Sequence, residues 1–153
     1  MSFSEFHNIA AEIVPVSAGA AGAQTAGALS AVTGEVIIDR EAHNMPLSAV
    51  LLIIWQATLV STHTFSLAYE VHHGEAANLS DTASLASATA AVVCTGIVAG
   101  TAQDGVLAIP LDLGGAKRYL RVTVTPTTSA GSADTVIFAA AFILGGASLV
   151  PAV

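Results

Sequence analysis

From residue 34 onward the chain is a succession of short apolar or alternating runs, each ended by turn-forming residues. The clearest run is Thr64–His73, in which polar and apolar side chains alternate along the whole length. Successive side chains of a strand point to opposite faces, so this alternation predicts a strand with one face in a core. Gly74 ends the run, and a polar loop is expected over Glu75–Ser84.

Other runs of strand length follow the same rule. Glu35–Arg40 alternates, and further strands are predicted at Ala49–Val60, Ala90–Val98, Gly105–Leu111, Tyr119–Pro126 and Thr135–Leu144. The breaks between these runs contain Gly, Asp or Ser, and helical spacing is absent after residue 34. Short strands at such regular intervals predict an all-β fold, an antiparallel β-sandwich.

Two of the predicted strands are unusually apolar. Ala49–Val60 is a nearly continuous Leu, Ile and Trp run, which predicts a strand buried on both faces. Thr135–Leu144 carries apolar side chains on both faces, with Val136, Phe138 and Phe142 on one and Ile137 and Ile143 on the other. Leaving such a face wet is costly at about 25 cal/mol per Å² of apolar area. This strand is therefore expected either to lie under other layers or to be covered by another subunit.

The first 33 residues lack the strand pattern and are predicted to form an N-terminal arm ahead of a β-sandwich domain at 34–153. Phe3, Phe6 and Ile9 have near-helical spacing within Ser2–Val14, which predicts a short helix. Because an isolated helix of about 12 residues is marginal, it needs a surface to lie on. Ser17–Thr33 is almost entirely Ala, Gly, Ser and Thr, which favours a flexible linker. The alternative is an extended arm that orders on contact with a neighbour.

Charge is scarce in this chain. Only 10% of the residues are charged, while 54% are hydrophobic, against about 25% charged in ordinary soluble domains. Much of the surface must therefore consist of Ala, Gly, Ser and Thr, which suits a protein packed against copies of itself or a larger assembly. The formal net charge is −7 with four basic residues. Three of the four cluster at 117–121, but three cations against eleven carboxylates make a weak electropositive patch. Nucleic-acid binding is therefore not expected, because it needs clustered cations that neutralise phosphates.

The apolar character does not indicate a membrane protein. No run approaches the roughly 20 apolar residues of a spanning helix, and the N-terminus lacks the basic region of a signal peptide. The chain is expected to be soluble and untargeted. Its single cysteine, Cys94, excludes an internal disulfide and is predicted to be a small buried hydrophobe.

The histidines raise the question of a metal site. His72 and His73 are adjacent in a predicted strand, so their side chains point to opposite faces and cannot readily bind one ion together. Glu70 and His72 do share a face, but a site would need a further ligand from His43 or His63. Solvent-facing polar side chains are the preferred interpretation, and no metal site is predicted.

No motif for catalysis is present. No serine lies in a Gly-x-Ser-x-Gly turn, and Cys94 has no histidine beside it in sequence. Gly114–Lys117 lacks the first glycine and the Ser/Thr of a phosphate-binding loop, and is predicted to be a hairpin turn. The chain is expected to have no catalytic residue and no cofactor, and not to be an enzyme.

One polar cluster stands out, at Lys117–Arg121. Strand alternation puts Tyr119 and Arg121 on one face and Arg118 on the other. The cluster is either a solvated edge with local salt bridges or a contact in which Arg118 or Arg121 pairs with carboxylates of a neighbour. Arg and Tyr are both favoured in protein interfaces.

The second half of the chain carries a familiar arrangement. A strand ends in Ile109–Asp112, a glycine turn follows, and then come Arg118–Val124, a Ser/Gly loop and a last apolar strand that closes with Leu144–Gly146. Together with Ser66–Ser84, this pattern resembles the small β-sandwich or jelly-roll decoration (cement) proteins of tailed-bacteriophage heads. The likeness covers roughly residues 34–147 and contains no sharp motif.

The resemblance implies that the β-sandwich is jelly-roll-like and that the chain is a non-enzymatic virion protein. It would form a homodimer or homotrimer, bind the major capsid protein on the capsid surface, and be made in the host cytoplasm. A tail or head–tail connector protein and a carbohydrate-binding β-sandwich are the alternatives, followed by a hydrolase on the same scaffold. The residues predicted to form contacts are Phe3, Phe6, Ile9, Arg118, Tyr119, Arg121, Ile137 and Ile143.

Overall fold

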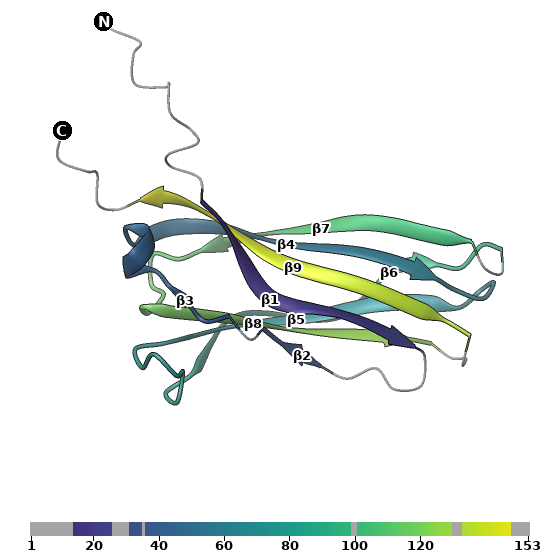
Figure 1. Ribbon diagram of the computed structural model, residues 1–153, viewed down its shortest axis with the longest axis horizontal. Helices are drawn as coiled ribbons and strands as arrows, with labels where there is room; N and C mark the ends of the chain where they lie inside the picture. The colour runs from purple at the N-terminus through teal and green to yellow at the C-terminus, as the bar shows by residue number, and fades with distance from the viewer. Residues whose placement is uncertain (1–13, 26–30, 35, 99–100, 130–132, 148–153) are drawn as a thin grey trace, which may run out of the picture.

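The structure, a computed structural model, describes residues 14–25, 31–34, 36–98, 101–129 and 133–147. These residues form two antiparallel sheets that lie face to face (Figure 1). Sheet I has the order β1 (Val14–Thr25), β9 (Thr135–Ala147), β4 (Pro46–Thr58), β7 (Ala102–Asp112). Sheet II has the order β2 (Val32–Thr33), β8 (Tyr119–Thr128), β5 (Thr64–Gly74), β6 (Ala83–Thr95), with β3 (Ile38–Asp39) also paired to β8.

The strand pairs are nested in the sequence like the layers of a folded ribbon. The innermost pair is the β5–β6 hairpin, which is enclosed by β4–β7, then by β2 and β3 on β8, and finally by β1–β9. The ribbon folds over so that successive pairs alternate between the two sheets. This arrangement is a jelly roll. The predicted all-β, antiparallel, jelly-roll-like sandwich is confirmed.

The core lies between the sheets and follows from strand alternation. Every second residue of β9 points inward, and these side chains are buried, as are the inward residues of β4 and β8. Trp55 of β4 and Phe65 of β5 meet edge to face across the sandwich, with ring centroids 5.6 Å apart. Gly105, opposite Trp55 in register, leaves room for the indole, because a Cβ there would lie 2.6 Å from its ring.

One expectation about burial needs correction, and for the last strand the cover by another subunit stays a prediction. The apolar run Ala49–Val60 forms β4, but it is not buried on both faces, because burial alternates along the strand. Ile53 is fully buried while its neighbour Ile54 is 54% exposed. The last strand, β9, has the same alternation, with Phe138 and Phe142 in the core and Ile137 exposed. It lies within sheet I between β1 and β4, and none of the described strands packs against its outer face.

The flexible-linker interpretation of Ser17–Thr33 is wrong wherever the structure describes that segment. Residues 14–25 form β1, which pairs with β9, and 32–33 form β2. Ala18 and Ala20 are fully buried, because their small side chains let β1 pack closely on the core. Gly34 continues this packing, since a Cβ there would lie 2.1 Å from the Ala18 carbonyl oxygen. A bulge between Ser17 and Ala21 allows the strand to bend, and Figure 1 shows β1 running obliquely across the sandwich.

The remaining boundaries differ in smaller ways. β5 is the predicted strand at Thr64–His73, extended by one residue. β6 begins at Ala83, seven residues before the predicted start, and the strand expected over Glu35–Arg40 is reduced to the two residues of β3. The helix predicted over Ser2–Val14 falls on residues 1–13, which lie outside the described part of the chain, and Val14 opens β1. In the residues described, no helix has the length and apolarity to span a membrane.

Candidate interaction surface

The outer side of sheet I carries apolar side chains in rows that cross all four strands. The register sets Ala21, Ala139, Ile54 and Val106 side by side in one row, and Ser17, Ala141, Leu52 and Ala108 in the next. The following row contains Pro15, Ile143, Val50 and Pro110. We call the apolar side chains of these rows, together with Ile137, the apolar face.

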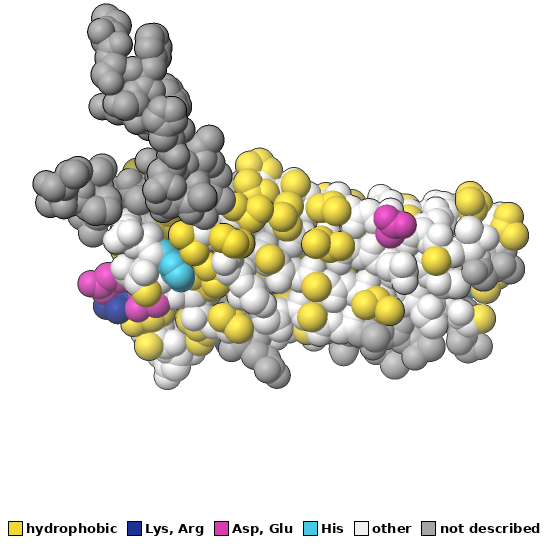
Figure 2. Space-filling model, turned by 45° about the horizontal axis from the view of Figure 1, so that its top comes forward, with side chains coloured by type: hydrophobic (Ala, Val, Ile, Leu, Met, Phe, Trp, Pro, Cys, Tyr) yellow, Lys and Arg dark blue, Asp and Glu magenta, His cyan; other side chains and the backbone are white. Residues whose placement is uncertain are grey.

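The apolar face is open to solvent in this chain. Ile54 and Ile137 are each 54% exposed and Val106 is 62% exposed. Figure 2 shows hydrophobic side chains spread over this side of the molecule, with little charge between them. The acidic side chains in the rows beside it, Asp104 and Asp112, both belong to the edge strand β7. Single exposed hydrophobic residues are ordinary, but a contiguous apolar patch of this kind marks an interaction site.

Two shallow depressions are set into the apolar face. The larger, of about 490 Å³, is lined among others by Ile54, Ile137 and Ala139. The second, of about 300 Å³, lies toward the other end of the strands and is lined by Val50, Pro110 and Ile143 among others. Both are open, so they suit the side chains of a protein partner better than an enclosed small molecule.

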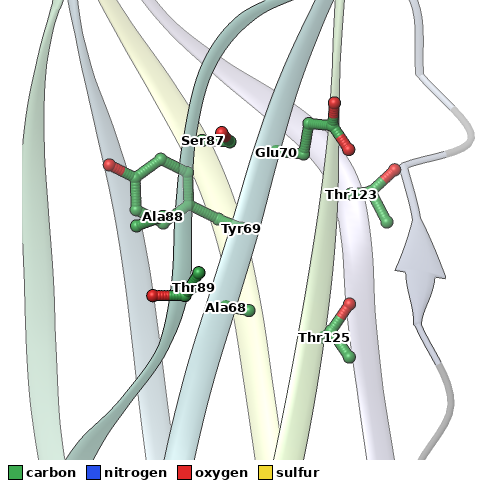
Figure 3. Close-up of a pocket in the computed structure, with 8 residues that line it drawn as sticks. All are labelled: Ala68, Tyr69, Glu70, Ser87, Ala88, Thr89, Thr123 and Thr125. Atoms are coloured by element: carbon green, nitrogen blue, oxygen red, sulfur yellow. The ribbon is translucent and has the colours of Figure 1, made fainter.

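The outer side of sheet II has the opposite character. Thr33 and Thr123 hydrogen-bond through their hydroxyls at 3.1 Å, and Thr123 lies 3.5 Å from the His72 ring nitrogen. A shallow groove of about 280 Å³ runs beside them, lined by Ala68, Tyr69, Glu70, Ser87, Ala88, Thr89, Thr123 and Thr125. Figure 3 shows the Tyr69 ring beside Ala88, with Thr123 and Thr125 on the other side of β5. The hydroxyls, the histidine and the Glu70 carboxylate make this part of sheet II more polar than the apolar face.

Charged residues gather at one end of the sandwich, where β3 and the loop before β8 meet. Arg118 donates to both carboxylate oxygens of Asp39, at 2.9 and 2.7 Å, and also pairs with Glu41. Its guanidinium lies 5.0 Å from the centre of the Tyr119 ring. The hydrogen bond from Arg118 lowers the pKa of Asp39, and the same bond raises the pKa of Arg118. We call this region, together with Arg40 and Lys117, the charged end.

Arg40 holds the charged end together from inside. It is 2% exposed, and its guanidinium donates to the carbonyl oxygens of Ala116, Lys117, Pro46 and Leu113. These contacts tie the turn after β3 to the start of β4 and to the loop between β7 and β8. Burial lowers the pKa of Arg40 from its ordinary value. Sequence reasoning missed this residue, since nothing in the pattern distinguishes it from a surface arginine.

At the opposite end of the sandwich, a buried aspartate organises the loops. Asp134 is fully buried and accepts a hydrogen bond from the Val60 backbone N–H at 2.8 Å. Its other carboxylate oxygen lies 2.8 Å from Nδ1 of His63. The contacts of Asp134 with His63 and Val60 hold the loop after β4 against the residues just before β9, so this pair stabilises the fold.

The residues predicted to form contacts divide into four groups. Ile137 and Ile143 lie on the outer side of β9, within the apolar face. Arg118 belongs to the charged end, where its described carboxylate partners, Asp39 and Glu41, are in its own chain. Tyr119 and Arg121 point outward from β8, on sheet II. Phe3, Phe6 and Ile9 lie outside the described residues.

The structure adds residues that the sequence did not indicate. Val50, Leu52, Ile54 and Val106 form the middle of the apolar face. The signal was present in the unbroken apolar run Ala49–Trp55, but a strand buried on both faces gives the same run.

The polar side chains considered for chemistry are dispersed. Across the described ranges, no group of three or more His, Cys, Asp or Glu side chains is placed to hold a metal ion. His72 lies 3.8 Å from Glu70, while His73 accepts a hydrogen bond from the Lys117 backbone N–H. Cys94 is half-buried against the core, and burial raises the pKa of its thiol.

Comparison with known proteins gives a relationship of fold. No protein-family model matches the chain, and no curated protein matches it in sequence. Among solved structures, VP2 of infectious bursal disease virus in a subviral particle is similar over 89% of this chain and 33% of its own, with 10% identity and a TM-score of 0.51. A chain of the Gx strain of the same virus is similar over 90% of this chain and 33% of its own, with 13% identity and a TM-score of 0.48.

What this chain shares with VP2 is its fold. The chain spans about a third of the length of the viral chains it resembles. The similarity therefore concerns one β-sandwich within a longer protein.

Proposed function

We propose that this chain is a structural protein of a virus particle, and more specifically a decoration protein of a tailed-bacteriophage head. The observation that carries the proposal is the apolar face, a whole side of a jelly roll that is almost free of charge. An exposed face of this kind belongs to a protein that works in an assembly. The jelly-roll fold, shared with a protein that forms a subviral particle, supports the same reading.

In this role the protein acts by mass action. Many copies bind the assembled shell of the major capsid protein and not its free subunits, so they stabilise the assembled state. The location is the capsid surface, and the chain is made in the host cytoplasm. No step of this mechanism requires a catalytic residue, a cofactor or a metal ion.

The proposal is tested on particles released by cells that carry the gene. Density-gradient fractions are analysed for the chain by quantitative mass spectrometry, and particles lacking the gene are compared for the temperature at which they release DNA. We expect many copies of the chain per head, and rupture at a lower temperature without it. Particles that lack the chain would contradict a virion role. A few copies per particle, placed at the tail by immunogold labelling, would indicate a tail or connector protein.

A second candidate function is the binding of a carbohydrate. It is favoured by the groove on sheet II, whose lining includes the Tyr69 ring, the hydroxyls of Ser87, Thr123 and Thr125, and the carboxylate of Glu70. Sugars commonly bind aromatic rings flanked by polar groups, but this groove is shallow and offers one aromatic residue. A screen on a glycan array with the wild type and Tyr69→Ala decides, since loss of a signal in the variant would support the carbohydrate-binding function.

A further inference from the structure

We propose that the apolar face binds the same face of a second copy, in a dimer whose two-fold axis runs parallel to the strands between β9 and β4. The inference deepens the proposed function and rests on it in one respect, that the chain works in an assembly. It names the occupant of the apolar face and the geometry of the contact. In this arrangement β4 of one copy lies over β9 of the other, and β7 lies over β1.

The first argument is area. β4 is paired with β7 over the 11 residues Ser48–Thr58, which at about 3.3 Å per residue is roughly 35 Å of strand. Four strands at about 4.8 Å give a width of roughly 19 Å, so the flat area is about 650 Å². The accessible area of a surface corrugated by side chains is larger. This agrees with the roughly 800 Å² that each partner contributes to a stable interface.

The second argument is shape. In the central rows the larger side chains stand on β4 and β7, as Leu52, Ile54 and Val106, while the neighbouring positions of β9 and β1 are alanines. A two-fold axis parallel to the strands puts Ile54 of one copy over Ala139 of the other, and Leu52 over Ala141. Val106 then lies over Ala21. In these two rows large side chains of one copy meet small ones of the other, which is the complementarity that sheet-on-sheet packing needs. In the next row Val50 of one copy lies over Ile143 of the other, and Pro110 lies over Pro15.

The third argument is charge. The chain carries a formal net charge of −7, so two copies repel each other wherever their charged parts approach. The apolar face is the side where they can meet without this penalty. Asp104 and Asp112 belong to the edge strand β7, and the two-fold axis puts the β7 strands of the two copies at opposite rims of the contact. Neither aspartate is brought against its equivalent.

A segment of the chain itself is a less suitable occupant. Residues 1–13 as a helix would be about 20 Å long, which is little more than half the length of the apolar face and narrower than its four strands. A second copy supplies a surface of matching size and character. We therefore treat the N-terminal segment and a foreign protein as outcomes of the test.

The test is sedimentation equilibrium of the purified full-length chain over a range of concentrations. The wild type is expected to have twice the 15.3 kDa mass of the chain. Val106→Asp places a charge in the contact and should weaken the dimer by at least about 100-fold. Val92→Asp is the matched control, because Val92 is 59% exposed on β6 of the other sheet, and it should leave the dissociation constant within about threefold of the wild type.

A swap of side chains tests the geometry. Ile54→Ala leaves a hollow under the partner's Ala139, and Ala139→Ile overfills the contact, so each should weaken the dimer by about tenfold or more. The double variant exchanges the large and the small side chain, and should restore dimerisation to within a few-fold of the wild type. Both positions are exposed in the single chain, so circular dichroism should report unchanged folding for all three variants.

Several outcomes would overturn the inference. A monomeric wild type would do so. If removal of residues 1–13 then produced a dimer, the N-terminal segment would be the occupant, and if the shortened chain stayed monomeric, a foreign protein would be. A dimer lost in Val92→Asp but kept in Val106→Asp would place the contact on sheet II. Additive single effects without rescue in the double variant would exclude this axis. Because the test uses purified protein alone, a negative result leaves the measurement of copies per particle, which tests the virion role, unaffected.

Discussion

The charged end and the apolar face differ in whether their side chains find interaction partners within the same chain. At the charged end, Arg40 donates to four backbone carbonyls and Arg118 pairs with two carboxylates, all within one chain. On the apolar face, Ile54 and Val106 are more than half exposed. The difference teaches that the conspicuous polar cluster is used to build the fold. The apolar side chains of sheet I are the ones left exposed without a partner among the described residues.

The largest expected effect comes from removing Arg40. Arg40→Met leaves four carbonyl oxygens without their donor, so the free energy of unfolding should fall by about 3–5 kcal/mol. Chemical denaturation at low protein concentration measures the loss. Sedimentation of the fraction that remains folded should show the association of the wild type, because Arg40 lies away from the apolar face. A variant as stable as the wild type would show that the charged end is dispensable.

Two adjacent residues of β4 provide a sharper version of the comparison. Ile53→Ala removes a fully buried side chain and should lower the free energy of unfolding by about 2–4 kcal/mol. Ile54→Ala removes an exposed one and should change the stability of the monomer by less than about 0.5 kcal/mol. Denaturation must be followed at concentrations where the wild type is dissociated, since association adds to apparent stability. Equal losses in the two variants would mean that Ile54 is buried within the single chain.

These two residues also show how far the sequence could go. The strand β5 was predictable because one of its faces is polar and the other apolar, so polar and apolar residues alternate along its sequence. The two-faced burial predicted for β4 was wrong, since an apolar run is produced equally by a second core layer and by an outer face that is open in the single chain. Hydropathy records that a face is apolar and not what covers it.

The strand β1 illustrates a different limit. Its Ala, Gly and Ser residues have no apolar period, so local sequence favoured a linker. The strand exists because β9 offers a paired edge and because Ala18 and Ala20 are small enough to be buried beneath it. Such tertiary stabilisation overrides weak local propensity. Arg40 is similar, since its four carbonyl partners come together only when three segments of the chain have folded.

A smaller effect is expected at the exposed part of the charged end. Arg118→Gln removes the ion pairs with Asp39 and Glu41, whose side chains are 30% and 59% exposed. Surface ion pairs contribute little, so stability should fall slightly and the difference should shrink in high salt. Association should be unchanged, as measured by sedimentation beside Val106→Asp. Loss of the dimer in Arg118→Gln would reverse the comparison and make the charged end a contact surface.

The smallest expected effect is a pH dependence at Asp81. Its carboxylate accepts hydrogen bonds from the backbone N–H groups of Glu75 and Ala76 at 2.8 and 3.0 Å, and these bonds lower its pKa below the ordinary value of 3.8. A carboxyl group with a lowered folded-state pKa stabilises the fold above its unfolded-state pKa, and this stabilisation is lost as pH falls through the folded-state pKa. The difference in unfolding free energy between the wild type and Asp81→Asn should therefore be constant above about pH 5 and shrink below about pH 4. Denaturation curves at pH 7, 5, 4 and 3 measure it. If the difference in unfolding free energy stays the same down to pH 3, protonated Asp81 stabilises the loop as well as the carboxylate does. The charge of Asp81 would then contribute nothing to the stability of the fold.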